Sequence, residues 1–318
     1  MTSMAPTVVF DRSLLTAHRD RAAGQIASCA FLLDRVMDDV VDRLGIVRRS
    51  FDDVVCLGAH HGAPGRALRT ALPGASVTET DMSHAMCRLC DGPAMCVDEE
   101  VLPFDTASVD CIVAPLTLQF VNDLPGALMQ IRRALRPDGF FLGAMTGGDT
   151  LFELAEAFAI AEADIRGGAS PRVAPRVDVR ALGGLLQRAG FTLPVTDVDQ
   201  IRVTYATPLD LMRDLKAMGA SNCLADRSRV PMSRELLMRA VEVYQDRFTG
   251  ADGRVYATFE IITMTGWSPH PDQPQPLKPG SATHRLADAL GVSERSAGET
   301  VSGGPAFGTN NVNDDGGD

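Results

Sequence analysis

Lysine is almost absent from this sequence of 318 residues. Only Lys216 and Lys278 occur among the 30 basic residues, so arginine carries nearly all of the positive charge. Because arginine stays protonated near neutral pH, few side chains remain for Schiff-base or general-base chemistry that depends on an amine. We interpret the preference for arginine as the codon bias of a GC-rich bacterial genome.

An excess of positive charge is also missing. The formal net charge is −11 and the isoelectric point is about 5.0. With no basic stripe to neutralise phosphates, the composition argues against binding of nucleic acid and against an anionic membrane surface. No apolar run approaches the roughly 20 residues that a membrane span needs. The hydrophobic fraction of 45% is ordinary for a globular protein with a core.

The cysteine count and the N-terminus both predict a cytoplasmic location. Seven cysteines are present, and an odd number without a secretory signal favours reduced thiols. Residues 1–9 are too short for a signal or transit peptide. We therefore expect a bacterial cytoplasmic protein without an integral membrane segment.

The hydrophobic pattern predicts three regions. Residues 1–45 are expected to form an N-terminal helical cap, because apolar residues recur at helical spacing within 17–44. Residues 46–267 are expected to form the main domain, with a helical lid at about 207–250. Residues 268–318 are rich in proline, glycine, asparagine and aspartate, so we predict a disordered tail.

Strands alternate with helices through the main domain. The predicted strands are 54–57, 76–80, 94–97, 111–114, 140–145, 199–205 and 256–265, and the predicted helices between them include 65–72, 84–90, 124–135, 177–189 and 234–248. This rhythm is typical of a parallel sheet with right-handed crossovers. It predicts an α/β Rossmann-like sheet of the class I methyltransferase type, with helices on both faces.

Glycines follow the first predicted strand, where such folds bind their ligands. Gly58 and Gly62 are present in the turn, and His60 stands where a third glycine is usual. Glycine lets the backbone approach a ligand, and the following helix N-terminus offers N–H groups. The turn is therefore the predicted cofactor loop.

Acidic residues follow the second and third predicted strands. Asp81, followed by Met82, could accept hydrogen bonds from both ribose hydroxyls of a nucleotide-like cofactor. Asp98 and Glu99 lie where an acidic side chain can accept from an adenine amino group. Each feature alone is weak, because a lone acidic residue after a strand is more often solvated or a helix cap. Their order and spacing together indicate the methyltransferase fold.

Several longer stretches resemble a known family, the assembly factor 5 family of respiratory complex I, which is related to the biotin-pathway malonyl-carrier O-methyltransferases. The matching stretches are Phe10-Asp11-Arg12, 98–104, 121–125, Gly143-Ala144-Met145, 147–151, 188–191, Met218-Gly219, Ser221-Asn222-Cys223, Gly266-Trp267 and 280–283. The resemblance covers about residues 10–283. Residues 147–151 and 221–223 are distinctive for this family rather than for methyltransferases in general.

The resemblance implies an S-adenosyl-L-methionine-like cofactor and a role in complex I assembly. The family's activity is hydroxylation of an arginine in a quinone-site subunit of complex I, so the implied partner is a peripheral-arm subunit. The implied cofactor-binding residues are Gly58, His60, Gly62, Asp81, Met82, Asp98 and Glu99.

The first motif departs from the family pattern. The family usually has aspartate at position 56 and Cys-Gly at 59 and 60, where this sequence has Cys56, Ala59 and His60. Loss of the carboxylate removes an acceptor, and the His60 side chain can block the close approach that glycine permits. These departures put cofactor binding in question and leave open a chaperone that lost catalysis.

Two clusters could bind a metal or act in proton transfer. His84, Cys87, Cys90 and Cys96 have a ligand-like spacing, but paired knuckles are missing, so we favour small buried side chains and predict no metal. His60 and His61 could be ligands or a general base, or a loop that drifted after cofactor binding was lost. For His60 and His61, a functional role and a drifted loop both stay open.

The substrate and the reaction are less constrained than the fold. Arg202, Tyr205 and Asn222 are predicted substrate contacts, although an ordinary strand arginine and a capping asparagine explain them equally well. No catalytic residue can be named. Three functions follow: an enzyme acting on a complex I subunit by arginine hydroxylation or methyl transfer, a non-catalytic assembly chaperone, and a small-molecule carboxyl methyltransferase.

Overall fold

The structure is a computed structural model that describes residues 8–175, 177–274 and 291. The chain divides into two units, Met1–Gln273 and Pro274–Asp318, and the fold lies in the first. Most of the predicted tail, 275–290 and 292–318, lies outside the described residues. Its beginning is ordered against the domain, because the Ser268 N–H donates to the Gly139 carbonyl at 2.8 Å and Gln273 is buried. The folded unit therefore continues past residue 267.

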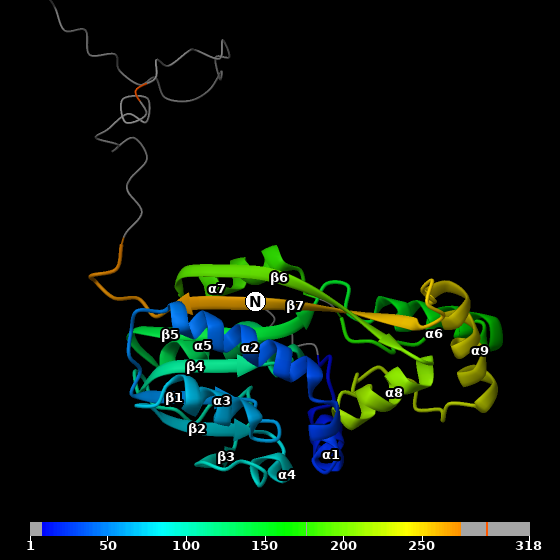
Figure 1. The fold of residues 1–318 in the computed structure, drawn as a ribbon, viewed down its shortest axis with the longest axis horizontal. Coiled ribbons are helices and arrows are strands. Elements are labelled where there is room, and N and C mark those ends of the chain that lie inside the picture. Colours follow the sequence, from blue (N-terminus) through cyan, green and yellow to red (C-terminus); the bar gives the residue numbers. More distant parts are fainter. Residues whose placement is uncertain (1–7, 176, 275–290, 292–318) are drawn as a thin grey trace, which may run out of the picture. The chain divides into compact units, whose positions relative to one another are not determined.

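Seven strands of the described residues form one sheet in the order β3-β2-β1-β4-β5-β7-β6 (Figure 1). The strands are β1 (Asp53–Leu57), β2 (Ser76–Asp81), β3 (Ala94–Cys96), β4 (Val109–Pro115), β5 (Leu135–Gly147), β6 (Thr192–Tyr205) and β7 (Val255–Trp267). The first five pair in parallel, and β7 runs antiparallel to both of its neighbours. The predicted Rossmann-like sheet is confirmed.

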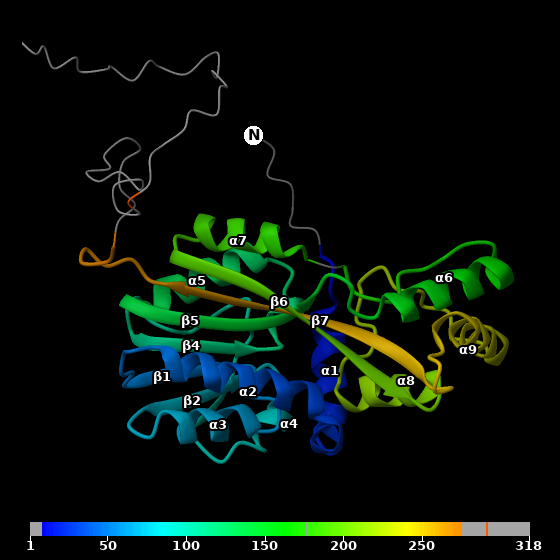
Figure 2. The same ribbon diagram turned by 45° about the horizontal axis from the view of Figure 1, so that its top comes forward.

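Helices cover both faces of the sheet. They are α1 (Arg12–Ala22), α2 (Phe31–Ile46), α3 (Ala63–Ala71), α4 (His84–Cys87), α5 (Leu124–Ala134), α6 (Phe152–Arg166), α7 (Val179–Arg188), α8 (Pro208–Ala217) and α9 (Arg234–Phe248), with 3₁₀ turns η1 (Ile26–Cys29) and η2 (Leu118–Phe120). In both ribbon views, α2 and α3 lie on one side of the central strands and α5 and α7 on the other (Figures 1 and 2).

The central strands bury side chains on both faces, which explains their unbroken apolar runs. In β4, Cys111 and Val113 join the core under α2 and α3, whereas Ile112 and Ala114 join the core under α5 and α7. This alternation follows from the period of two along a strand. The strands are therefore fixed in register, and their carboxyl ends meet at one edge of the sheet, which we call the carboxyl edge.

The N-terminal region forms three helical pieces where the sequence predicted one pattern over 17–44. The Asp11 side chain accepts the Leu14 N–H at 3.0 Å and caps α1, which ends shortly before Gly24. After η1, α2 packs along the sheet. The break lets α1 turn away and contact α4 and α8 at the carboxyl edge (Figure 2).

The last two strands extend past the shorter ones toward α6, α8 and α9 (Figure 2). The predicted lid at 207–250 contains α8 and α9, and α9 packs on α6. These helices and α1 therefore surround the carboxyl edge. Within residues 8–175 and 177–274, no helix is long and apolar enough to cross a bilayer.

Candidate functional site at the carboxyl edge

The turn after β1 requires glycine at two positions. Gly58 has φ +93°, and a Cβ built there would lie 2.7 Å from the Thr117 Cβ. Gly62 has φ +78° at the start of α3, where a Cβ would lie 2.9 Å from the Leu89 carbonyl oxygen. Both predicted glycines therefore shape the turn itself, whatever ligand it holds.

Gly58→Ala is expected to lower the free energy of unfolding by about 2–4 kcal/mol, because it combines backbone strain with a steric overlap in the core. Urea unfolding measures the change. Gly74→Ala is the matched control, since nothing lies within 4 Å of a Cβ at Gly74. Equal free energies of unfolding for Gly58→Ala and Gly74→Ala would contradict the predicted strain at Gly58.

His60 is the residue of this turn that differs most from a glycine loop. Its φ is +51°, and its side chain is buried. Nε2 lies 2.8 Å from the Pro115 carbonyl oxygen, and Nδ1 lies 3.4 Å from Arg19 Nη2. Because the guanidinium can only donate, Nδ1 accepts and Nε2 carries the proton. Burial, followed by the nearby Arg19 charge, lowers the pKa of His60 to about 4, so the ring is neutral.

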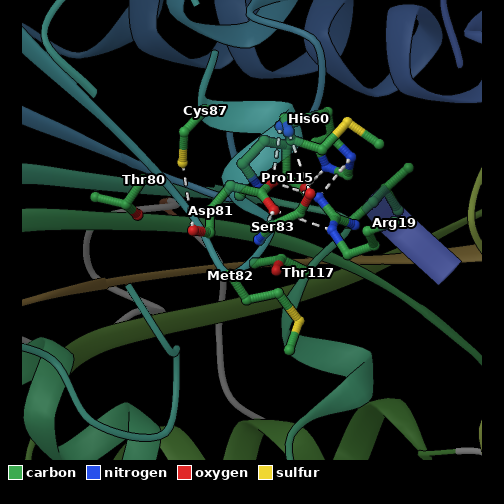
Figure 3. A network of polar contacts seen from close by, with 12 residues as sticks. Arg19, His60, Thr80, Asp81, Met82, Ser83, Cys87, Pro115 and Thr117 are labelled. Atoms are coloured by element: carbon green, nitrogen blue, oxygen red, sulfur yellow. Dashed lines mark hydrogen bonds and ion pairs between the residues drawn. The ribbon is translucent and has the colours of Figure 1, made fainter. Parts of the chain in front are cut away.

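Asp81, at the end of β2, is completely buried and fully hydrogen-bonded (Figure 3). One carboxylate oxygen accepts from Arg19 Nε at 3.1 Å and from the Ser83 N–H at 2.9 Å. The other accepts from Arg19 Nη2 and from the His60 N–H, the latter at 3.0 Å. The predicted ribose acceptor therefore holds a guanidinium group of this chain.

Asp98 and Glu99 hold a second arginine of α1. The Arg12 guanidinium donates to both carboxylates, with a distance of 2.6 Å to Asp98. The buried Glu99 also accepts the Thr117 hydroxyl at 2.9 Å. Met82, the other predicted cofactor contact of this edge, is buried in a small apolar cluster under α1. All predicted acidic landmarks thus converge at the edge, but they face α1.

A cavity of about 370 Å³ opens beside these groups. Arg19 and His60 line it, together with apolar side chains from α2, β5, α6, α8 and β7. The loop 167–175, which we call the roof loop, contributes Arg172, Val173, Ala174 and Pro175 to the lining. The cavity is therefore mainly apolar, and it is bounded by segments far apart in the sequence.

The predicted substrate residues are separated in space. Asn222 lines the cavity and donates to the Pro171 carbonyl at 3.0 Å, which joins it to the roof loop. Arg202 lies on β6 over the Tyr256 ring, 4.4 Å from its centroid, and Tyr205 is buried at the end of β6. Neither belongs to the lining residues of this cavity.

Sequence reasoning missed the groups that hold the site closed. Arg12 and Arg19 are seven residues apart in α1, so they share a helix face, and this spacing was visible in the sequence. Glu162 was missed as well. It is buried at the end of α6 and binds Arg172 and Ser170 of the roof loop. No local pattern distinguishes it from a solvated helix carboxylate.

His84, Cys87, Cys90 and Cys96 do not form a metal site in the structure. Among the described residues, no group of three or more His, Cys, Asp or Glu side chains is placed to hold a metal ion. Desolvation raises the pKa of Cys87 to about 11 and of Cys90 to about 12. The Cys87 thiol lies 3.5 Å from the Asp81 carbonyl oxygen (Figure 3). These thiols are protonated groups packed beneath the site.

S-adenosylmethionine, the cofactor implied by the fold, does not fit the residues as they are arranged. A ribose would need free acceptor capacity on a carboxylate, and all four acceptor positions of Asp81 are used. The His60 side chain and its bond to Pro115 also occupy the space between the ends of β1 and β4. The fold provides the expected edge, and its own side chains close it.

The chain is similar in sequence and in fold to known proteins. A family model described as a methyltransferase domain matches residues 55–143. The structure of YcgJ from Bacillus subtilis superimposes with a TM-score of 0.51 and 14% identity, covering 74% of this chain and 99% of that one. At that identity the likeness concerns the fold alone.

Two curated relatives are similar over most of their length. The chain is 39% identical over 291 residues to the mitochondrial arginine-hydroxylase NDUFAF5 of Danio rerio, covering 88% of this chain and 89% of the relative. It is 36% identical over 275 residues to the malonyl-[acyl-carrier protein] O-methyltransferase of Laribacter hongkongensis, covering 81% and 90%. The similarity thus includes the helices around the cavity as well as the sheet.

Proposed function

Because the chain belongs to the family of the arginine hydroxylases NDUFAF5, we propose that it modifies an arginine of a respiratory complex I subunit during assembly. The proposed partner is a peripheral-arm subunit, and the proposed setting is the bacterial cytoplasm. Hydroxylation is the proposed reaction, after the name that these relatives carry. It replaces a C–H bond of the arginine by C–OH, with dioxygen as the oxidant, a two-electron donor as the reductant, and water formed from the second oxygen atom. S-adenosylmethionine is the proposed cofactor, and it would bind only after the arginines of α1 have left Asp81, Asp98 and Glu99. The residues proposed to contact it then are Gly58, His60, Gly62, Asp81, Met82, Asp98 and Glu99.

The cavity beside the carboxyl edge is the observation that carries the proposal. Much of its wall comes from outside residues 55–143, from α1, α6, the roof loop and residues 218–224. The similarity to the NDUFAF5 relative of Danio rerio covers 88% of this chain, far more than residues 55–143. A concave, mainly apolar cavity with a few polar groups is typical of a substrate site.

The lining suits the aliphatic stem of an arginine better than its charged end. Leu154, Phe158 and Phe259 offer apolar surface to the methylene groups. Among the described lining residues there is no Asp or Glu. Asp81 lies behind Arg19, which does line the cavity, and it is already paired with Arg19, so it offers no free carboxylate to a target guanidinium.

Mass spectrometry of complex I subunits tests the proposal. A strain that lacks the gene is expected to lose an added oxygen on one arginine and to regain it with the wild-type chain. Added methylene mass instead would indicate methyl transfer. Restored assembly without any gene-dependent arginine modification would contradict the proposal.

Two other functions each have one observation in their favour. The Arg19–Asp81 pair favours an assembly chaperone without catalysis, because it closes the expected cofactor site. The similarity to malonyl-[acyl-carrier protein] O-methyltransferases favours a small-molecule carboxyl methyltransferase. Growth of a biotin auxotroph that carries this gene would support the latter and count against the proposal.

A further inference from the structure

Arg19 and Asp81 form an ion pair that is removed from water. The side chain of Arg19 is 4% exposed and that of Asp81 is 0% exposed. Nε and Nη2 of the guanidinium engage the two carboxylate oxygens separately, which is the paired geometry that arginine prefers. Such a pair is well matched, and breaking it leaves a buried charge.

Three residues of α1, Arg12, Arg19 and Asp20, make polar contacts with the carboxyl edge. Arg12 binds Asp98 and Glu99 after β3, and Arg19 binds Asp81 after β2. Next to Arg19, the Asp20 carboxylate accepts the Ser83 hydroxyl at 2.5 Å. Because α1 spans two helical turns between its arginines, one rigid element supplies both guanidinium groups.

The attachment of α1 is separate from the two main cores. Leu15 packs with Phe10, Met82, Cys223 and Leu224 in a small cluster of its own. Elements with few shared core contacts open at lower free energy than the global fold. The helix can therefore leave the edge without disrupting the sheet faces.

We infer that α1 is a built-in plug of the carboxyl edge, so that a ligand with an adenosine-type ribose binds only after Arg19 has left Asp81. The identity of that ligand rests on the proposed function, whereas the plug rests on the contacts of Arg12, Arg19 and Asp20. While α1 is docked, ribose hydroxyls and Arg19 compete for the same carboxylate oxygens.

The plug is also joined to the cavity wall. The Asp11 carboxylate accepts from Arg227 at 3.1 Å, and the Asp11 N–H donates to the Cys223 carbonyl at 2.8 Å. Cys223 lines the cavity. A ligand in the cavity that shifts residues 222–227 therefore shifts the start of α1, and such coupling acts equally in both directions.

Calorimetry with S-adenosylhomocysteine tests the plug on the full chain. Arg19→Gln is expected to bind about tenfold to a hundredfold more tightly than the wild type, because a charge-assisted competitor is removed. Arg35→Gln is the matched control, since Arg35 is an exposed arginine paired with Asp199 on the surface. Equal or weaker binding by Arg19→Gln, or no binding by either chain, would overturn the inference.

Hydrogen exchange on the unaltered chain gives a second readout in case Arg19→Gln folds poorly. With saturating S-adenosylhomocysteine, the amides of α1 are expected to exchange faster while those of α5 stay unchanged. Slower exchange or no change in α1 would show that the helix stays docked over the ligand and would overturn the plug. Failure of the proposed function is distinguishable, because it appears in the arginine masses of complex I and not in these binding measurements.

Discussion

Glu162→Ala is expected to remove at least about nine-tenths of the proposed arginine modification while the sheet stays folded. Glu162 is the anchor of the roof loop. Its carboxylate accepts the Ser170 hydroxyl at 2.8 Å and Arg172 Nε at 3.0 Å. Arg172 in turn lies over the Phe158 ring, 5.2 Å from its centroid. Without the carboxylate, the loop loses about 2–4 kcal/mol of local ordering, which corresponds to more than a tenfold change in its closed population.

Two measurements distinguish an effect on the roof loop from an effect on the whole fold. Arginine modification is followed in a deletion strain that carries the variant, and trypsin cleavage after Arg172 is followed on the purified chain. Glu156→Ala is the matched control, because Glu156 lies on the same helix and pairs only at the surface with Arg247. Glu162→Gln should give a rate of tryptic cleavage between those of the wild type and Glu162→Ala, since it keeps one acceptor oxygen for Ser170 but loses the charge that faces Arg172. Unchanged tryptic cleavage of Glu162→Ala would contradict the anchoring role.

The loop also explains why the cavity is apolar although arginines line it. Arg172 is neutralised by Glu162, and Arg19 is neutralised by Asp81, each by a carboxylate outside the lining. The positive charge of each arginine that lines the cavity is therefore balanced by the carboxylate that it binds. The two pairs fix the roof loop and α1 against the cavity.

The sequence was most informative where one physical signal dominates. The buried runs at 54–57 and 111–114 predicted β1 and β4, because strands covered on both faces must be apolar throughout. Gly58, Asp81 and Asp98 were placed correctly at strand ends, since parallel topology brings those ends together.

Whether the site is open or closed by side chains of this chain could not be predicted from the same signals. Arg19 and Asp81 are 62 residues apart, and the sequence contains no local mark of their pairing. The pairing depends on the break between α1 and α2, which the helical spacing over 17–44 concealed. Similarly, the alternation in β6 predicted a strand but not that Arg202 would lie over Tyr256 rather than at the cavity.

The stability of the chain is expected to fall by roughly 2 kcal/mol between pH 7 and pH 4.5 through His60 alone. Burial and the Arg19 charge lower the pKa of His60 from 6.5 to about 4, while Asp81 and the bond to Pro115 oppose them. Below pH 6.5 the unfolded chain therefore binds a proton at His60, which the folded chain does not bind until the pH approaches 4. Stability is complete above that pH and is lost as the pH falls toward 4.

Urea unfolding at a series of pH values measures this loss. His60→Asn is the informative variant, because asparagine does not titrate and tolerates a positive φ. It should flatten the pH dependence between 4.5 and 6.5 relative to the wild type, whereas His270→Asn, far from the edge, should not. A wild-type slope that survives in His60→Asn would show that other groups carry the acid sensitivity. A flattened slope would show that His60 is held neutral as the acceptor for Arg19, which the closed edge requires.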